Sequence, residues 1–211
     1  MSGLDPDIIV LSDDPGGLAH SPVAQNGNLI RLVVGSLNGV RRASHDIVMK
    51  IRTDAIFHGN ACLNHFNAWP KRRADFRIFD ERIIVPNIGT ADPEVHVCFQ
   101  ISDWTMLGTK KDLIHLFDIS LDKANGTNKS PEQYIWLSAI QKIVPGIDID
   151  NINDKTPQAV QDTISFMTNN LVILDTMAQY QFHCEKYKHL PDDQSVNMRH
   201  AKWATWYEGI Q

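Results

Sequence analysis

The segment Arg52-Thr53-Asp54 follows a short apolar run and places a cation and a carboxylate two residues apart. Residues 46–52 are typical of a strand buried on both faces, because 47–51 is apolar at all positions but one. Open α/β sheets bind their ligands at the carboxyl ends of such strands. We therefore expect Asp54 to hold a divalent cation and, through it, a diphosphate. The alternative is a carboxylate that only caps the next turn.

The elements that must position this segment begin with a βαβ pattern. A strand over 7–12, a helix over 28–42 and the strand over 46–52 predict two parallel strands joined by a right-handed crossover. Further along we expect helices over 59–68, 110–117, 130–143 and 156–169, strands over 76–79, 82–86 and 96–101, a short apolar run over 171–174 and a polar tail after residue 187. This order of elements predicts an α/β fold.

The composition suits a single α/β domain with a substantial core. The chain has 211 residues, 43% of them hydrophobic, and its net charge of −5 argues against a general nucleic-acid binder. No apolar stretch is long enough to span a bilayer, and the N-terminus lacks the features of a signal peptide. Cys62, Cys98 and Cys184 form neither a zinc pattern nor a disulfide framework, so we expect a cytoplasmic protein.

Several segments in a consistent order carry a resemblance to a known family. They are Ile9-Val-Leu-Ser12, Val48-Met-Lys-Ile-Arg-Thr-Asp54, Asp80-Glu-Arg-Ile-Ile-Val-Pro-Asn-Ile-Gly-Thr90, Ile101-Ser-Asp-Trp104 with Gly108, Pro131-Glu-Gln-Tyr-Ile-Trp136, Asn170-Leu-Val-Ile-Leu-Asp175 and Lys186-Tyr187. Together, over about residues 8 to 190, they resemble the WavE family of lipopolysaccharide-synthesis proteins, which look like glycosyltransferases of the GT-A type.

The resemblance implies a fold and a division of the chain. The fold is an open, mostly parallel α/β sheet with flanking helices. It occupies a GT-A-like domain over residues 1–190, followed by a C-terminal tail over 191–211. Only six residues precede the strand expected over 7–12. We therefore expect an N-terminally shortened domain that lacks the first βα unit of a complete GT-A fold.

The implied function is transfer of a sugar from a nucleotide sugar to a lipopolysaccharide or other surface-glycan acceptor. Enzymes of this type commonly hold the diphosphate through a cation on an Asp-x-Asp motif, whose place is taken here by Arg52 and Asp54. Asp54 would bind Mg²⁺ or Mn²⁺ through oxygen. Arg52 replaces the first acid and would contact phosphate with its planar fork, or else pair with a nearby acid.

An inverting transfer also needs a base for the acceptor hydroxyl, and Asp103 and Glu132 are the candidates. Glu132 lies in the first turn of a predicted helix, where GT-A enzymes often place a catalytic acid, although an acid there also stabilises the helix dipole. Asn87, Gly89 and Trp104 would complete the nucleotide-sugar site. Gly89 would allow a positive φ or close approach of substrate, and Trp104 would stack on a sugar or belong to the core. A retaining mechanism stays open.

The expected partners are a nucleotide sugar and a glycan or lipid-linked glycan acceptor, without nucleic acid. Peripheral association with the cytoplasmic face of the inner membrane stays open. One alternative is a non-catalytic glycosyltransferase-like module that binds a glycan or a protein. Another is a hydrolase that uses paired carboxylates drawn from Asp13, Asp54 and Asp103.

Overall fold

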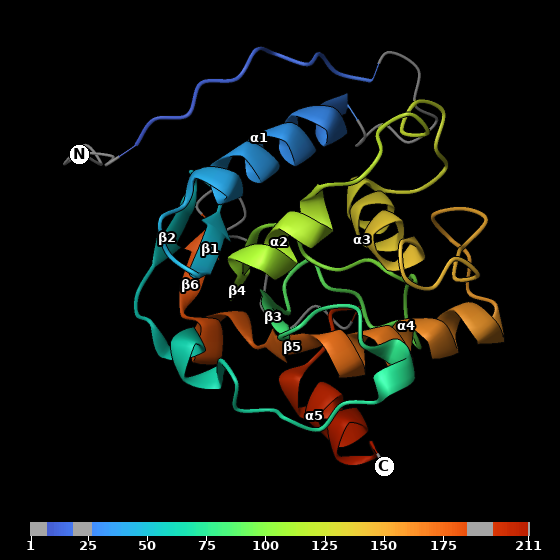
Figure 1. The fold of residues 1–211 in the computed structure, drawn as a ribbon. Coiled ribbons are helices and arrows are strands. Elements are labelled where there is room, and N and C mark those ends of the chain that lie inside the picture. Colours follow the sequence, from blue (N-terminus) through green and yellow to red (C-terminus); the bar gives the residue numbers. More distant parts are fainter. Residues whose placement is uncertain (1–7, 19–26, 185–195, 211) are drawn as a thin grey trace.

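The computed structural model describes residues 8–18, 27–184 and 196–210, with a four-stranded sheet at their centre (Figure 1). The strands follow the order β1 (Ile47–Ile51), β4 (Thr105–Thr109), β3 (Ile83–Pro86) and β5 (Leu171–Leu174). β4 pairs antiparallel with β1 and β3, whereas β3 and β5 pair in parallel. β1, β3 and β5 therefore run in one direction. They finish at what we term the carboxyl end of the sheet, where β4 begins.

The expected mixed α/β fold, with an open sheet and flanking helices, is confirmed, but the mostly parallel pairing needs correction. Three of the four strands run in the same direction, yet β4 lies between β1 and β3 and runs against both. Only the β3–β5 pair is parallel. The reversed strand matters for the site, because it returns the chain to the carboxyl end of the sheet.

The strand expected near the N-terminus is not formed. Residue 7 lies outside the described residues, and 8–12 adopt no regular structure, with Ile9 71% and Leu11 90% exposed. The predicted parallel crossover into β1 is therefore wrong. β1 is instead an outer strand whose ends are half-exposed, so the prediction of a strand buried on both faces is also wrong.

In the described part of the chain, five helices flank the sheet, namely α1 (Leu29–Arg42), α2 (Lys110–Phe117), α3 (Pro131–Gln141), α4 (Pro157–Asn170) and α5 (His200–Glu208). α1 packs on α2 and α2 on α3, while α4 and α5 pack on β5 (Figure 1). The first four were predicted. The start of α3 is fixed by a capping box, in which Ser130 Oγ accepts from the backbone N–H of Gln133 and Gln133 Oε1 accepts from that of Ser130.

Several connecting segments differ from the sequence-based expectation. The helix expected over 59–68 is only a 3₁₀ turn, Ala61–His65. No strand forms over 76–79 or 96–101: Phe76 ends a 3₁₀ turn, Ala74–Phe76, and the other residues form irregular loops. β4 and α5 were not predicted. A small antiparallel sheet of β2 (Ala55–Phe57) and β6 (Phe182–Cys184) was not predicted either. None of the described helices has the length and apolar character needed to cross a membrane.

Two buried tryptophans show how the helices join the core around the sheet. Trp136 of α3 donates from its indole N–H to the carbonyl of Ile101, just before β4. Trp203 of α5 donates to the carbonyl of Met167 in α4, so the C-terminal helix shares the same core. Buried indole groups of this kind need a hydrogen-bond acceptor, and both have one. The loop before β4 is thereby fixed from the side of α3.

Candidate functional site

A cavity of about 490 Å³ opens at the carboxyl end of the sheet. Its wall contains five of the predicted site residues, Arg52, Gly89, Asp103, Trp104 and Glu132, together with Gln100, Pro131 and the first turn of α1. These residues come from five separated parts of the chain. The structure therefore brings most of the predicted site together in one place. We call it the sheet-end cavity.

Strand pairing explains why these residues meet. Ile51, the last residue of β1, lies opposite Thr105, the first residue of β4. Arg52 therefore lies beside Trp104, with its guanidinium carbon 5.7 Å from the centre of the indole ring. Asp103 was predicted to follow a strand, but it precedes one. The antiparallel direction of β4 brings Asp103 to the same end of the sheet as Arg52.

Arg52 and Asp54 form a two-pronged ion pair. Nε and Nη2 of Arg52 each donate to one carboxylate oxygen of Asp54, both at 2.8 Å. These hydrogen bonds lower the pKa of Asp54 to about 2 and raise the pKa of Arg52. Asp54 lies outside the wall of the sheet-end cavity. The pairing with a nearby acid, left open from the sequence, is the arrangement observed.

A metal ion held by Asp54 does not fit this arrangement. Both oxygens that would coordinate a hard cation already accept hydrogen bonds from Arg52. In the part of the chain that the structure describes, no three His, Cys, Asp or Glu side chains gather in a way that would hold a metal ion. Among the described residues that line the cavity, Arg52 supplies the cationic group.

Two carboxylates, Asp103 and Glu132, line the cavity, and the ammonium group of Lys50 lies behind Asp103. The Lys50 Nζ lies 3.7 Å from Asp103 Oδ2 and also donates to the Asp103 carbonyl, and both side chains are only 11% exposed. Burial raises the pKa of Glu132, and the negative charge of Asp103 raises it further. Glu132 is therefore a stronger proton acceptor than an ordinary glutamate.

Lys50 was missed by the sequence prediction, although a signal for it exists. It is the one charged residue within β1, and strand alternation places it on the same side as Arg52. Burial lowers the pKa of Lys50, an effect that Asp103 partly offsets and Arg52 reinforces. A buried lysine of this kind needs a partner, and Asp103 supplies the charge.

Gly89 and Asn87 shape the cavity in different ways. Gly89 has φ +76 in a turn closed by the Thr90 N–H donating to the Asn87 carbonyl, and a Cβ there would lie 3.4 Å from Ser102 Oγ. Glycine is thus favoured by conformation and by space. Asn87 does not line the cavity. Its buried Oδ1 accepts from the backbone N–H and hydroxyl of Thr176, which ties the end of β3 to the segment after β5.

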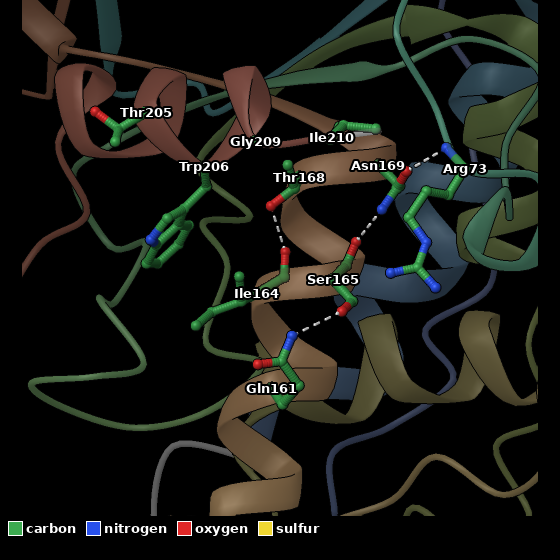
Figure 2. A pocket seen from close by; sticks show the side chains of 10 residues that line it. All are labelled: Arg73, Gln161, Ile164, Ser165, Thr168, Asn169, Thr205, Trp206, Gly209 and Ile210. Carbon is green, nitrogen blue, oxygen red and sulfur yellow. Dashed lines mark hydrogen bonds between the residues drawn. The ribbon is translucent and has the colours of Figure 1, made fainter.

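A larger cavity, about 610 Å³, lies between α4 and α5 (Figure 2). Figure 2 shows polar side chains of α4 engaged within that helix: Thr168 donates to the Ile164 carbonyl and Asn169 to the Ser165 carbonyl. Arg73 reaches this wall, but none of the described residues lining it is an acid. The cavity offers no group for proton transfer, so we place the functional site at the sheet-end cavity.

A mixed α/β fold with acids and an arginine at the carboxyl end of its sheet is a common framework for ligand-binding proteins. The family described as WavE lipopolysaccharide synthesis matches residues 1–209, and the chain belongs to this family. Family membership gives the chain a role in lipopolysaccharide synthesis. Comparisons with curated proteins and with solved structures gave no match.

Proposed function

We propose that this protein is a glycosyltransferase that moves a sugar from a nucleotide sugar to a lipopolysaccharide or other surface-glycan acceptor. One observation carries the proposal. In a chain of a lipopolysaccharide-synthesis family, a single cavity combines a half-buried acid of raised pKa with an arginine and a tryptophan. Glycosyl transfer needs a base, a group that stabilises a leaving diphosphate and a surface for a sugar ring.

Arg52 is assigned to the diphosphate. Its planar fork suits phosphate oxygens, and its contact with Asp54 fixes the guanidinium at the cavity wall. Lys50 adds a second positive charge nearby, partly balanced by Asp103. Fixed charges of this kind stabilise the negative charge that develops on a leaving diphosphate, without reorganisation during the reaction. No role in this step is given to a metal ion.

Glu132 is assigned as the base in an inverting transfer. The acceptor hydroxyl oxygen forms a bond to the anomeric carbon, and the bond from that carbon to the diphosphate breaks. The hydroxyl proton passes to the Glu132 carboxylate, and the electron pair leaves with the nucleoside diphosphate. Asp103 is a positioning residue here, because its charge raises the proton affinity of Glu132 while Lys50 balances it.

The binding of nucleotides tests this proposal directly. Calorimetric titration with UDP, GDP and CDP, and with their sugar conjugates, should give saturable binding of one nucleotide class. Arg52→Ala should weaken it about 10- to 100-fold, as expected for a lost hydrogen bond between charged groups. Arg73→Ala is the matched control, since Arg73 also pairs with an aspartate two residues on, but lies at the other cavity.

Two outcomes would count against this assignment. If the folded protein binds no nucleotide or nucleotide sugar, the alternative of a non-catalytic glycan- or protein-binding module takes its place. If Arg52→Ala and Arg73→Ala weaken binding equally, the nucleotide does not occupy the sheet-end cavity. The hydrolase alternative has less support, because of the three acids considered for it only Asp103 lines this cavity.

A further inference from the structure

A second cavity, of about 400 Å³, lies next to the sheet-end cavity and shares part of its wall. Gly89, Gln100 and Trp104 line both, so the two are neighbouring compartments separated by these three residues. Arg52 lies over the Trp104 ring and lines only the first compartment. Trp104 therefore lies between the charged sheet-end cavity and the second cavity.

The second cavity differs from the first in charge. None of the described residues that line it is Asp, Glu, Lys or Arg. Apolar side chains such as Ile88 and Ile152 form much of its wall, and the polar groups include the carboxamides of Gln100, Asn153 and Asn197. An aromatic ring beside apolar side chains and carboxamides suits an uncharged ligand with hydroxyl groups, and not a phosphate.

Among these groups, Asn197 gives the strongest indication of a ligand. The residue is only 8% exposed, and among the described residues its buried Nδ2 has no hydrogen-bond partner. Its backbone is fixed by a bridge to Ala91, between Val196, whose carbonyl accepts from the Asp92 N–H, and Met198, whose N–H donates to the Thr90 carbonyl. A buried donor without an acceptor destabilises a fold. Asn197 also lines the second cavity, and a turn of its carboxamide toward the cavity would bring Nδ2 to a ligand oxygen.

We propose that the second cavity binds a sugar ring of the acceptor glycan, with a ring hydroxyl accepting from Asn197 Nδ2 and the ring packed on Trp104. The acceptor role rests on the proposed glycosyl transfer. Gln100 connects the two compartments: its side-chain oxygen accepts from Ser130 Oγ at 2.6 Å, at the start of the helix that carries Glu132. An acceptor hydroxyl at this boundary faces the base, while the rest of its ring lies against Asn197.

Saturation-transfer NMR of the full chain with methyl glycosides of glucose, galactose, mannose and N-acetylglucosamine tests this site. Asn197→Leu should weaken glycoside binding at least about tenfold, the effect of one lost hydrogen bond in a buried site. Nucleoside diphosphate binding should stay within about twofold. The melting temperature should not fall, because leucine removes a buried donor without a partner. An asparagine with a purely structural role would give a lower melting temperature and unchanged glycoside binding, which overturns the proposal.

A second variant keeps the test independent of changes in the core. Asn153 is exposed at the cavity wall, so Asn153→Trp should fill the cavity and abolish glycoside binding without altering the fold. Asn125→Trp, at an exposed asparagine away from both cavities, is the matched control.

Three results separate the two proposals. Glycoside binding that is insensitive to Asn197→Leu and Asn153→Trp overturns the sugar site. Competition for the second cavity by a free nucleoside overturns it too, by making the cavity a nucleobase site. Glycoside binding that both variants abolish, in a protein that binds no nucleotide sugar, supports the sugar site while glycosyl transfer fails.

Discussion

Two arginines in this chain make the same local contact in very different places. Arg52 pairs with Asp54 through Nε and Nη2, and Arg73 pairs with Asp75 through the same two nitrogens. Each guanidinium also lies over an aromatic ring, 5.7 Å from the centre of Trp104 in one case and 5.9 Å from that of Phe76 in the other. Sequence spacing alone does not separate the two pairs.

The two arginine–aspartate pairs differ in their exposure and in the residues around them. The side chains of Arg52 and Asp54 are 30% and 32% exposed, and those of Arg73 and Asp75 are 49% and 58% exposed. Strand pairing brings Asp103 to the first pair, next to Lys50 of β1, and helix α3 adds Glu132. The second pair borders a cavity in which Thr168 and Asn169 bond to carbonyls of helix α4 (Figure 2). An Arg-x-Asp segment becomes a candidate site only through what distant segments add to it.

The largest expected effect comes from removing the Glu132 carboxylate from the sheet-end cavity, because the described lining of the cavity between α4 and α5 has no acid. Glu132→Gln removes the base, so kcat should fall by about 10²- to 10⁴-fold. Nucleotide affinity should change little. Gln161→Ala, in the other cavity, should leave kcat unchanged. Turnover is measured as nucleoside diphosphate release in the presence of acceptor. An undiminished kcat in Glu132→Gln would show that Glu132 is not the base.

The pH dependence of turnover should come next in size. Burial and the negative charge of Asp103 raise the pKa of Glu132, and only the deprotonated carboxylate accepts a proton. The rate should therefore fall as pH drops, with an acidic limb above the usual glutamate pKa of about 4.3. Asp103→Asn removes the negative charge and should move that limb to lower pH. A limb that stays in place would mean that Asp103 does not act on the base.

The contribution of Glu132 to the stability of the fold should depend on pH in the opposite direction to turnover. A carboxyl whose pKa is raised by folding stabilises the folded state while protonated and loses that contribution as pH rises through the raised value. Glu132→Gln should therefore unfold at the same or a higher temperature than the unchanged protein at neutral pH. Loss of turnover without loss of stability distinguishes a removed base from a damaged fold.

The parts of the fold that were predictable from sequence are those specified by local signals. The start of α3 at Ser130-Pro131 and of α4 at Thr156-Pro157 rests on capping chemistry within four residues. β4 lacked such a signal. It has five residues with Gly108 among them, and its partner strands lie far away in sequence. The polar sequence around Trp203 likewise gave no local signal for α5.

The site residues likewise differ in whether local sequence signals identify them. Arg52, Asp103 and Glu132 were found through motifs and family resemblance, and the structure places them in one cavity. Lys50 and Asn197 were not found, because their interest lies in burial and in the partners they have or lack. Those properties arise only when distant segments pack together. The single charge in the apolar β1 was the one sequence signal for Lys50, and it does not name the partner.

The smallest expected effect compares the two aspartates. Asp54→Asn weakens the contact that orients Arg52 but also removes a negative charge near the diphosphate. These effects oppose each other, so nucleotide affinity should change by less than about fivefold. Asp75→Asn should not change it. Affinities measured by calorimetry in Mn²⁺ and in EDTA decide the point, because binding that requires Mn²⁺ and disappears in Asp54→Asn would make Asp54 a metal ligand and not the partner that holds Arg52.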